Sequence, residues 1–365
     1  MNIVAAVARE PGLRFSVETI ELDEPKSDEI LVRIAGVGIC HTDLAAKNGA
    51  AQMTLPAVLG HEGAGVVERT GVAVTKVSPG DHVVLTMRTC GQCVRCRRSD
   101  QSYCHNRVGL NYAKGRLDGT STFRSVDGRI ASNFFGQSSF AEYAIAYERN
   151  VVKVPKTVPL EILGPLGCGV QTGAGAVINS MALPKGATLL VIGGGSVGLS
   201  AVLGAVVQEC ATIIVVEPFA SRRQLALELG ATHAFASGAA SLPAAVLEIL
   251  DVGAEYILDT TGHPEYQQAA LRSLAPKGVF GFVGISPDAT TPPGDMNRIM
   301  RSGHTIRGII EGDSDPDVFI PQMIDLYEKG RFPFDRLIGF YPLRDINQAV
   351  ADQHDGTCVK AVLIP

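Results

Sequence analysis

The sequence predicts an α/β protein of two domains, in which a β-rich domain is combined with a doubly wound parallel sheet. Three observations lead to this prediction. The chain has 365 residues, which is more than one hydrophobic core usually holds. Short β-branched segments fill the first half, whereas strands alternate with helical periods from about residue 157 onward. A glycine-rich turn follows one buried strand of the second half.

The strands expected in the first half are short, β-branched and bounded by Gly, Pro or Asp. They include 30–38, 64–68 and 82–86. Segment 105–140 is polar, rich in glycine and weakly periodic. We therefore interpret it as a long excursion that follows a cluster of cysteines.

The alternation in the second half is typical of a parallel sheet covered by helices. Strands are predicted at 188–192, 212–217, 255–259 and 278–284. Helices are predicted at 196–208, 220–229 and 264–274, and the tail adds a helix at 316–329 and a strand at 359–364. We expect one domain over residues 1–157, completed by 300–365, and a second over 158–299.

Charge and hydropathy exclude several classes of function. The net charge is −5 and no basic block occurs, so no nucleic-acid partner is expected. Residues 186–208 carry no charge, but three consecutive glycines interrupt them, which favours a buried strand, turn and helix over a membrane span. The first residues resemble a strand more than a signal peptide, so we expect a cytoplasmic protein.

A candidate dinucleotide site follows the strand at 188–192. The turn Gly193-Gly194-Gly195-Ser196-Val197-Gly198 satisfies the pattern G-x-G-x-x-G, and a helix follows it. Such glycines let the backbone approach a pyrophosphate, whose charge the helix N-terminus stabilises. Glu217 ends the next strand, where its carboxylate would accept hydrogen bonds from ribose hydroxyls. A glycine-rich turn without a ligand is the alternative.

The acid also bears on the choice of cofactor. The carboxylate of Glu217 favours NAD, because it would repel a 2′-phosphate. Arg222 and Arg223 follow shortly and could hold such a phosphate, so NADP remains a second possibility.

Four of the eight cysteines form a compact cluster. Cys90, Cys93, Cys96 and Cys104 follow the pattern C-x2-C-x2-C-x7-C. Four thiolates can close a tetrahedral zinc site that leaves no position for a substrate, so its role would be structural. An iron–sulfur cluster and reduced free cysteines are the alternatives.

Cys40, His61 and Cys168 are scattered along the chain, each beside a glycine or within two residues of one. Two thiolates and one imidazole would make an open zinc site with a fourth position for water or an alcohol. The spacing alone does not prove such a site, because a lone Cys or His in apolar surroundings is usually a core residue.

Several motifs together resemble the zinc-containing medium-chain dehydrogenase/reductase family along almost the whole chain. They are GHEGAGVV at 60–67, PGDHV at 79–83, the four-cysteine loop, GCGVQTG at 167–173 and the glycine turn. FGQSSF at 135–140 resembles the aryl- or benzyl-alcohol dehydrogenase branch. The resemblance implies a GroES-like catalytic domain and a Rossmann cofactor domain.

The resemblance also implies roles for individual residues. Cys40, His61 and Cys168 would hold the catalytic zinc, with Glu62 just behind it as a transient ligand. Asp43 would hydrogen-bond His61, and Thr42 would take the alcohol proton.

Further positions would serve the cofactor. Thr172 and Val197 would pack near the nicotinamide, and His41 and Lys360 would face the pyrophosphate. One position departs from the best-known members, because Ala45 replaces the histidine that ends their proton relay. The proton would therefore leave by the cofactor ribose and solvent, or by another group.

These expectations describe an enzyme with two zinc ions per chain. It would interconvert a primary aromatic or allylic alcohol and its aldehyde with NAD, as a homodimer or homotetramer. Thr86, Leu110, Phe134 and Phe135 are the expected pocket residues. The rivals are a glutathione-linked formaldehyde, aliphatic alcohol or polyol dehydrogenase and a non-enzymatic zinc- and nucleotide-binding protein. Cys168 argues against the polyol branch, which usually has glutamate there.

Overall fold

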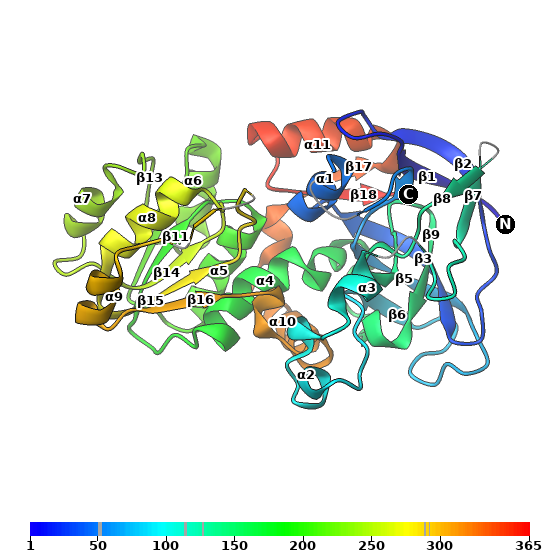
Figure 1. The fold of residues 1–365 in the computed structure, drawn as a ribbon, viewed down its shortest axis with the longest axis horizontal. Coiled ribbons are helices and arrows are strands. Elements are labelled where there is room, and N and C mark those ends of the chain that lie inside the picture. Colours follow the sequence, from blue (N-terminus) through cyan, green and yellow to red (C-terminus); the bar gives the residue numbers. More distant parts are fainter. Residues whose placement is uncertain (50–52, 113–114, 126–127, 288–289, 292) are drawn as a thin grey trace. The chain divides into compact units, whose positions relative to one another are not determined.

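The structure, a computed structural model, describes residues 1–49, 53–112, 115–125, 128–287, 290–291 and 293–365 (Figure 1). The chain forms two compact units. The first comprises Met1–Gly169, Asp315–Glu328 and Asp335–Pro365, and the second comprises Val170–Ser314 and Lys329–Phe334. Among the described residues, no helix is long and apolar enough to cross a membrane.

The first unit is built on two sheets. One has the order β4-β1-β2-β7-β8, and the other has the order β10-β6-β5-β3-β18-β17, with β9 also paired to β3. Their strands are β1 (Asn2–Ala8), β2 (Ser16–Leu22), β3 (Glu29–Gly38), β4 (Ala57–Val58), β5 (Glu62–Thr70), β6 (His82–Leu85), β7 (Phe123–Ser125), β8 (Gly128–Ile130), β9 (Tyr143–Tyr147), β10 (Val151–Val154), β17 (Ile338–Pro342) and β18 (Lys360–Ile364).

The long strand β3 organises the second of these sheets. Its apolar residues are almost all buried, because it pairs with β5, β9 and β18. The C-terminal strand β18 runs antiparallel to it, with Val362 opposite Gly38. This register carries the start of β18 to the end of β3, where the candidate metal site lies.

The second unit holds a parallel sheet with the strand order β13-β12-β11-β14-β15-β16. The strands are β11 (Thr188–Ile192), β12 (Thr212–Val216), β13 (His233–Phe235), β14 (Ala254–Asp259), β15 (Leu274–Phe282) and β16 (Thr305–Gly308). The connecting helices are α5 (Ser196–Val207), α6 (Ala220–Glu228), α7 (Leu242–Leu247), α8 (Pro264–Ser273) and α9 (Met296–Ser302). This order is that of a doubly wound Rossmann sheet.

The predicted fold class is confirmed, and the strands and helices predicted for the second half end within a few residues of the observed ones. The largest shift is in β15, which begins at Leu274 rather than 278. The excursion at 105–140 contains more structure than expected, namely α3 (Arg107–Asn111), β7 and β8. The first compact unit runs to Gly169, because the turns at 160–167 pack against β3 and β5.

Candidate metal and cofactor sites

Three candidate zinc ligands converge in the first unit. Cys40 lies at the N-terminus of α1 (His41–Lys47), His61 directly precedes β5, and Cys168 follows the 3₁₀ turn η5 (Gly164–Gly167). Their ligand atoms and a carboxylate oxygen of Glu62 lie within 4.8 Å of one another. His61 is fully buried, and among the described residues its Nε2 has no hydrogen-bond partner. A buried ring nitrogen without a partner is costly, and two thiols and an imidazole are donors that zinc prefers, so the site fits that metal.

Asp43 connects two of these candidate ligands. Its Oδ2 accepts a hydrogen bond of 2.9 Å from the backbone N–H of Cys40. Its Oδ1 accepts from the N–H of Gly60 at 3.0 Å and from Nδ1 of His61 at 2.8 Å. Because Nδ1 is the donor, Nε2 is left as the nitrogen that can bind a metal. The fully buried carboxylate therefore fixes both the tautomer of His61 and its distance from Cys40.

The surroundings of Cys40 favour a thiolate. A hydrogen bond with Cys168 lowers the pKa of the Cys40 thiol well below its ordinary value, against the effect of burial. The charges of His61 and Lys360 lower the same pKa. The thiolate is the form of cysteine that binds metal ions.

Glu62 and Lys360 form a buried ion pair beside the candidate ligands. The Nζ of Lys360 donates to the two carboxylate oxygens of Glu62 at 2.8 and 3.0 Å and to the carbonyl of Ile39 at 2.9 Å. The N–H of Gly169 donates to Glu62 at 3.0 Å. Burial raises the pKa of Glu62, and Lys360 opposes that effect. From the sequence we expected Lys360 to face a pyrophosphate. Its ion pair with Glu62 was not predicted, because no local motif indicates it.

An aromatic cluster packs against His61. The ring of Phe135 stacks on the imidazole with centroids 4.4 Å apart, and Phe134 meets it edge-on at 5.6 Å. Tyr112 contacts both phenyl rings, at 5.9 Å from Phe134 and 5.5 Å from Phe135. Tyr112 comes from the excursion after the cysteine cluster and was not among the expected pocket residues.

The two other expected pocket residues are also buried. The hydroxyl of Thr86 donates to the carbonyl of Gly167 at 2.7 Å, next to Cys168. Leu110 lies in α3, two residues before Tyr112.

Helix α1 carries the remaining candidates for proton transfer. Thr42 and Ala45 are half-buried and lie three residues apart, which places them on one face of the helix. His41 is exposed at its first position.

The four-cysteine cluster is preassembled around a common centre. The sulfur atoms of Cys90, Cys93, Cys96 and Cys104 lie within 4.8 Å of one another. Backbone N–H groups also donate to sulfur, from Cys90 to Cys104 and from Cys93 to Cys90, both at 3.3 Å. Hydrogen bonds from backbone N–H groups lower the pKa of Cys93 to about 6. Four converging sulfurs with amide donors fit a closed zinc site.

The glycine turn of the second unit is shaped for a close ligand. Gly193 has a φ of +98°, and a Cβ on Gly198 would collide with the carbonyl of Gly193. A Cβ on Gly195 would meet nothing within 4 Å, so the turn is open on that side. Glu217 is buried at the end of β12 and accepts hydrogen bonds from the N–H groups of Gly194 at 2.7 Å and Phe219 at 2.9 Å.

The two arginines after Glu217 lie differently. Arg223 donates to the carbonyl oxygens of Glu217 and Pro218. The guanidinium of Arg222 lies over the ring of Phe219, 4.9 Å from its centroid.

The expected nicotinamide contacts also lie in the second unit. Thr172 belongs to α4 (Gly169–Gly175) and Val197 to the first turn of α5. A Cβ on Gly173 would collide with the carbonyl of Val197, so the two helices pack closely at this point.

Comparison with known proteins gives a consistent result. Residues 26–156 match the alcohol dehydrogenase GroES-like domain, and residues 196–329 match the zinc-binding dehydrogenase family. A geraniol dehydrogenase from Castellaniella defragrans is 46% identical over 363 residues, which cover 99% of this chain and 97% of the relative.

Two solved structures are also similar over the full chain. The crystal structure of benzyl alcohol dehydrogenase from Acinetobacter calcoaceticus is 40% identical with a TM-score of 0.95, covering 100% of this chain and 99% of that one. An alcohol dehydrogenase zinc-binding domain protein from Burkholderia ambifaria is 48% identical with a TM-score of 0.97 and the same coverage. The chain therefore belongs to the zinc-containing medium-chain alcohol dehydrogenase family, and it is an oxidoreductase of that family.

Proposed function

We propose that the protein is an NAD-dependent zinc dehydrogenase that interconverts primary aromatic or allylic alcohols and their aldehydes. The observation that carries this proposal is that the donor set of Cys40, His61 and Cys168 lies beside the aromatic cluster that packs against His61. Flat unsaturated groups pack well against such rings. The similarity to a geraniol dehydrogenase and a benzyl alcohol dehydrogenase supports the same substrate class.

In this proposal the three residues hold the catalytic zinc and the four-cysteine cluster holds a second. Bound zinc would supply a Lewis acid that lowers the pKa of an alcohol, and bound nicotinamide would accept the hydride. Asp43 keeps Nε2 of His61 free to bind metal, and Glu62 stays within reach as a transient ligand. The hydroxyl of Thr42 would take the alcohol proton and pass its own proton on. Ala45 offers no acceptor at the next position of such a relay, so the proton would leave to solvent or to another group.

The proposed NAD site combines the turn of Gly193, Gly195 and Gly198 with Glu217. The pyrophosphate would lie on the open side of Gly195 at the N-terminus of α5. Glu217 would receive the ribose hydroxyls and disfavour a 2′-phosphate, whereas Arg222 is the side chain nearest in sequence that could accommodate one.

The other cofactor contacts follow the family. Thr172 and Val197 would flank the nicotinamide, and the exposed His41 would contact the pyrophosphate. Lys360 would do so only after leaving Glu62, so His41 is the better candidate.

We further propose a cytoplasmic homodimer or homotetramer. The edge strand β16 supports an assembly of this kind, because all four of its residues are exposed and its outer edge has no partner strand among the described residues.

A substrate panel tests the proposal. Purified protein is assayed with benzyl, cinnamyl and other allylic alcohols, with ethanol and 2-propanol, and with S-hydroxymethylglutathione, each with NAD and NADP. We expect kcat/KM for the flat primary alcohols to exceed that for ethanol by about 10- to 100-fold, the scale of contacts in an apolar pocket. Higher kcat/KM for short aliphatic or secondary alcohols, or for the glutathione adduct, would overturn the proposed substrate class. A preference for NADP would overturn the proposed role of Glu217.

A further inference from the structure

Two rings of the aromatic cluster beside His61, those of Phe134 and Phe135, belong to a strained turn at residues 133–138. Asn133, Phe135 and Ser138 have φ values of +64°, +53° and +55°, in the left-handed region. Asparagine tolerates this conformation, but a phenylalanine rarely adopts it. A strained residue of this kind persists only where the surroundings hold it firmly. The position of the Phe135 ring therefore depends on what fixes residues 133–138.

Buried amides hold the second half of this turn. The side chain of Asn150 donates to the carbonyls of Phe135 at 3.2 Å and Gly136 at 3.0 Å. Gln137 donates to the carbonyl of His61 at 2.9 Å and accepts from the N–H of Gly63 at 3.2 Å. These contacts attach the turn directly to the segment that carries the candidate metal ligand.

The first half is held through a chain of buried polar groups. The side-chain N–H of Asn133 donates to the hydroxyl of Tyr147 at 2.7 Å. That hydroxyl donates to the carboxylate of Glu29 at 3.1 Å. Burial raises the pKa of Tyr147, and the negative charge of Glu29 raises it further, so the phenol keeps its proton.

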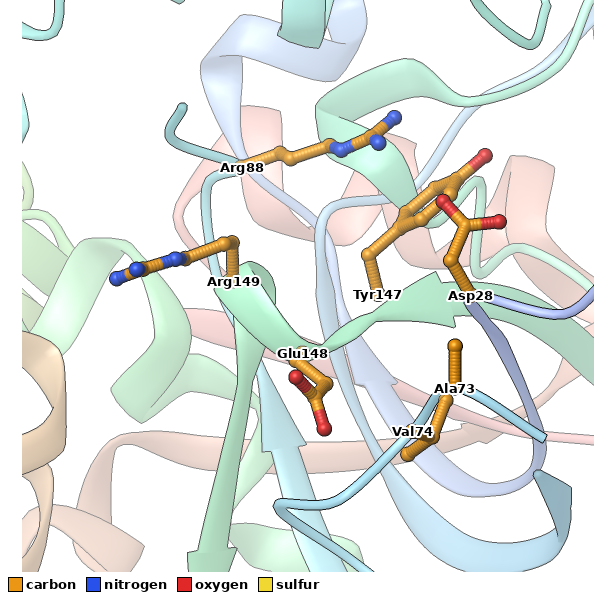
Figure 2. Close-up of a pocket in the computed structure, with 7 residues that line it drawn as sticks. All are labelled: Asp28, Ala73, Val74, Arg88, Tyr147, Glu148 and Arg149. Carbon is orange, nitrogen blue, oxygen red and sulfur yellow. The ribbon is translucent and has the colours of Figure 1, made fainter. Parts of the chain in front are cut away.

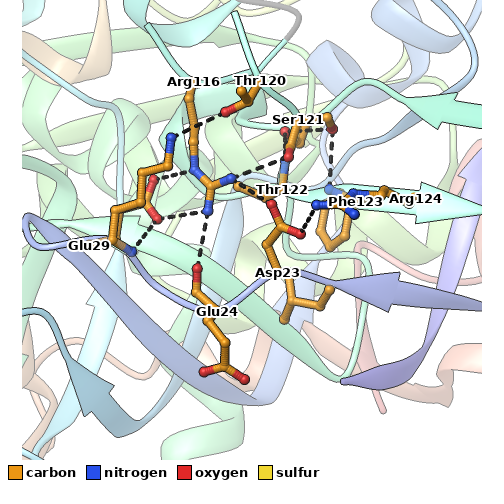
Figure 3. A network of polar contacts seen from close by, with 12 residues as sticks. Asp23, Glu24, Glu29, Arg116, Thr120, Ser121, Thr122, Phe123 and Arg124 are labelled. Atoms are coloured by element: carbon orange, nitrogen blue, oxygen red, sulfur yellow. Dashed lines mark hydrogen bonds and ion pairs between the residues drawn. The ribbon is translucent and has the colours of Figure 1, made fainter. Parts of the chain in front are cut away.

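The last group in this series of hydrogen bonds is the guanidinium of Arg116, which belongs to the excursion at 105–140. Arg116 donates to both oxygens of Glu29, at 2.7 and 2.9 Å, and to Asp23 at 2.8 Å (Figure 3). It also donates to the carbonyls of Ser121 and Glu24. Arg116 and Glu29 are almost completely buried, so the group is an internal anchor rather than a surface ion pair.

The ring of Tyr147 is covered by an arginine side chain. The guanidinium of Arg88 lies 3.3 Å from the ring centroid, and the two side chains line a small pocket with Asp28 (Figure 2). The backbone of Arg88 exchanges two hydrogen bonds with the side chain of Asn111, at 2.8 and 2.9 Å. Asn111 directly precedes Tyr112. Contacts therefore connect Tyr147 both to Tyr112 and to the turn that carries Phe134 and Phe135.

We propose that Arg116, Glu29, Tyr147 and Asn133 form a positioning network that holds Phe134 and Phe135 against His61 and so sets the preference for flat, unsaturated alcohols. None of the four residues needs to touch substrate, cofactor or metal. The proposal rests on the proposed dehydrogenase function for its substrates, but the geometry that it assigns to the turn can be tested without turnover.

The test is the variant Tyr147→Phe, which keeps the ring under Arg88 and removes the hydroxyl between Asn133 and Glu29. We expect the ratio of kcat/KM for benzyl alcohol to kcat/KM for 1-propanol to fall about tenfold, the scale of one misplaced contact in an apolar pocket. Zinc content and kcat/KM for 1-propanol should change less than about twofold. The matched control is Tyr143→Phe on the same strand, which should leave the ratio unchanged.

A crystal structure of zinc-loaded Tyr147→Phe supplies the readout that is independent of activity. We expect the Phe135 ring to leave its stacking position 4.4 Å from His61. An unchanged ratio with an unmoved ring would overturn the network, as would an equal loss of activity on both alcohols, which indicates a general structural role. If the wild-type protein oxidises no alcohol, the proposed function fails and the position of the Phe135 ring alone decides on the network.

Discussion

Replacing Cys40 with serine is expected to remove one zinc ion per chain and to lower alcohol turnover about 10³-fold or more. A metal that polarises the reacting oxygen contributes several kcal/mol to the transition state, and each 1.36 kcal/mol is a factor of ten in rate. Serine is nearly isosteric with cysteine but is a poor zinc ligand, and the backbone N–H of residue 40 can still donate to Asp43. The fold should therefore persist. Metal analysis measures the zinc content, circular dichroism shows whether the fold persists, and initial rates measure the turnover.

The control is Cys210→Ser. Cys210 lies in the turn before β12, in the second unit and outside both cysteine groups. Its replacement should change neither zinc content nor rate. Full activity of Cys40→Ser with an unchanged zinc content would show that the converging thiol is not a metal ligand.

Replacing Lys360 with methionine is expected to destabilise the protein by about 3–5 kcal/mol, because the carboxylate of Glu62 is then buried without its cation. Lys360 is 1% exposed and Glu62 is fully buried, so water cannot solvate the remaining charge. In a chain of this size such a loss corresponds to a decrease in Tm of roughly 5–15 °C. Differential scanning calorimetry of the zinc-loaded protein measures it.

Two further variants separate the buried charge from other effects. The double variant Glu62→Gln with Lys360→Met removes both charges and should recover most of the lost Tm. Lys153→Met breaks the ion pair that the exposed side chain of Lys153 makes with Asp81, and it should lower the Tm only slightly. A small effect of Lys360→Met, or a double variant no more stable than the single one, would contradict the ion-pair account.

Local patterns were sufficient to predict the cofactor-binding unit. Gly193, Gly195 and Gly198 lie in one short turn. Glu217 follows one helix and one strand later, so a single βαβ unit positions all four residues. The strand and helix periods around them are strong, because buried parallel strands and packed helices constrain their residues closely.

The metal site was predictable only in part. Cys40, His61 and Cys168 are far apart in sequence, and only the family resemblance selected them from the other cysteines and histidines. Lys360 reaches Glu62 because β18 pairs with β3, and a register between distant strands is not encoded in any local pattern. The same holds for Tyr147 and Glu29, which face each other across the pairing of β9 with β3.

The most direct test of the central claim is to count zinc in the purified wild-type protein and to measure initial rates of NAD reduction with benzyl alcohol on the same sample. We predict close to two zinc ions per chain, turnover that increases with benzyl alcohol concentration to saturation, and loss of that turnover when a chelator removes the metal. Two zinc ions with no turnover on any aromatic, allylic or aliphatic alcohol would contradict the proposed activity, and turnover that persists in metal-free protein would contradict the role of zinc in it.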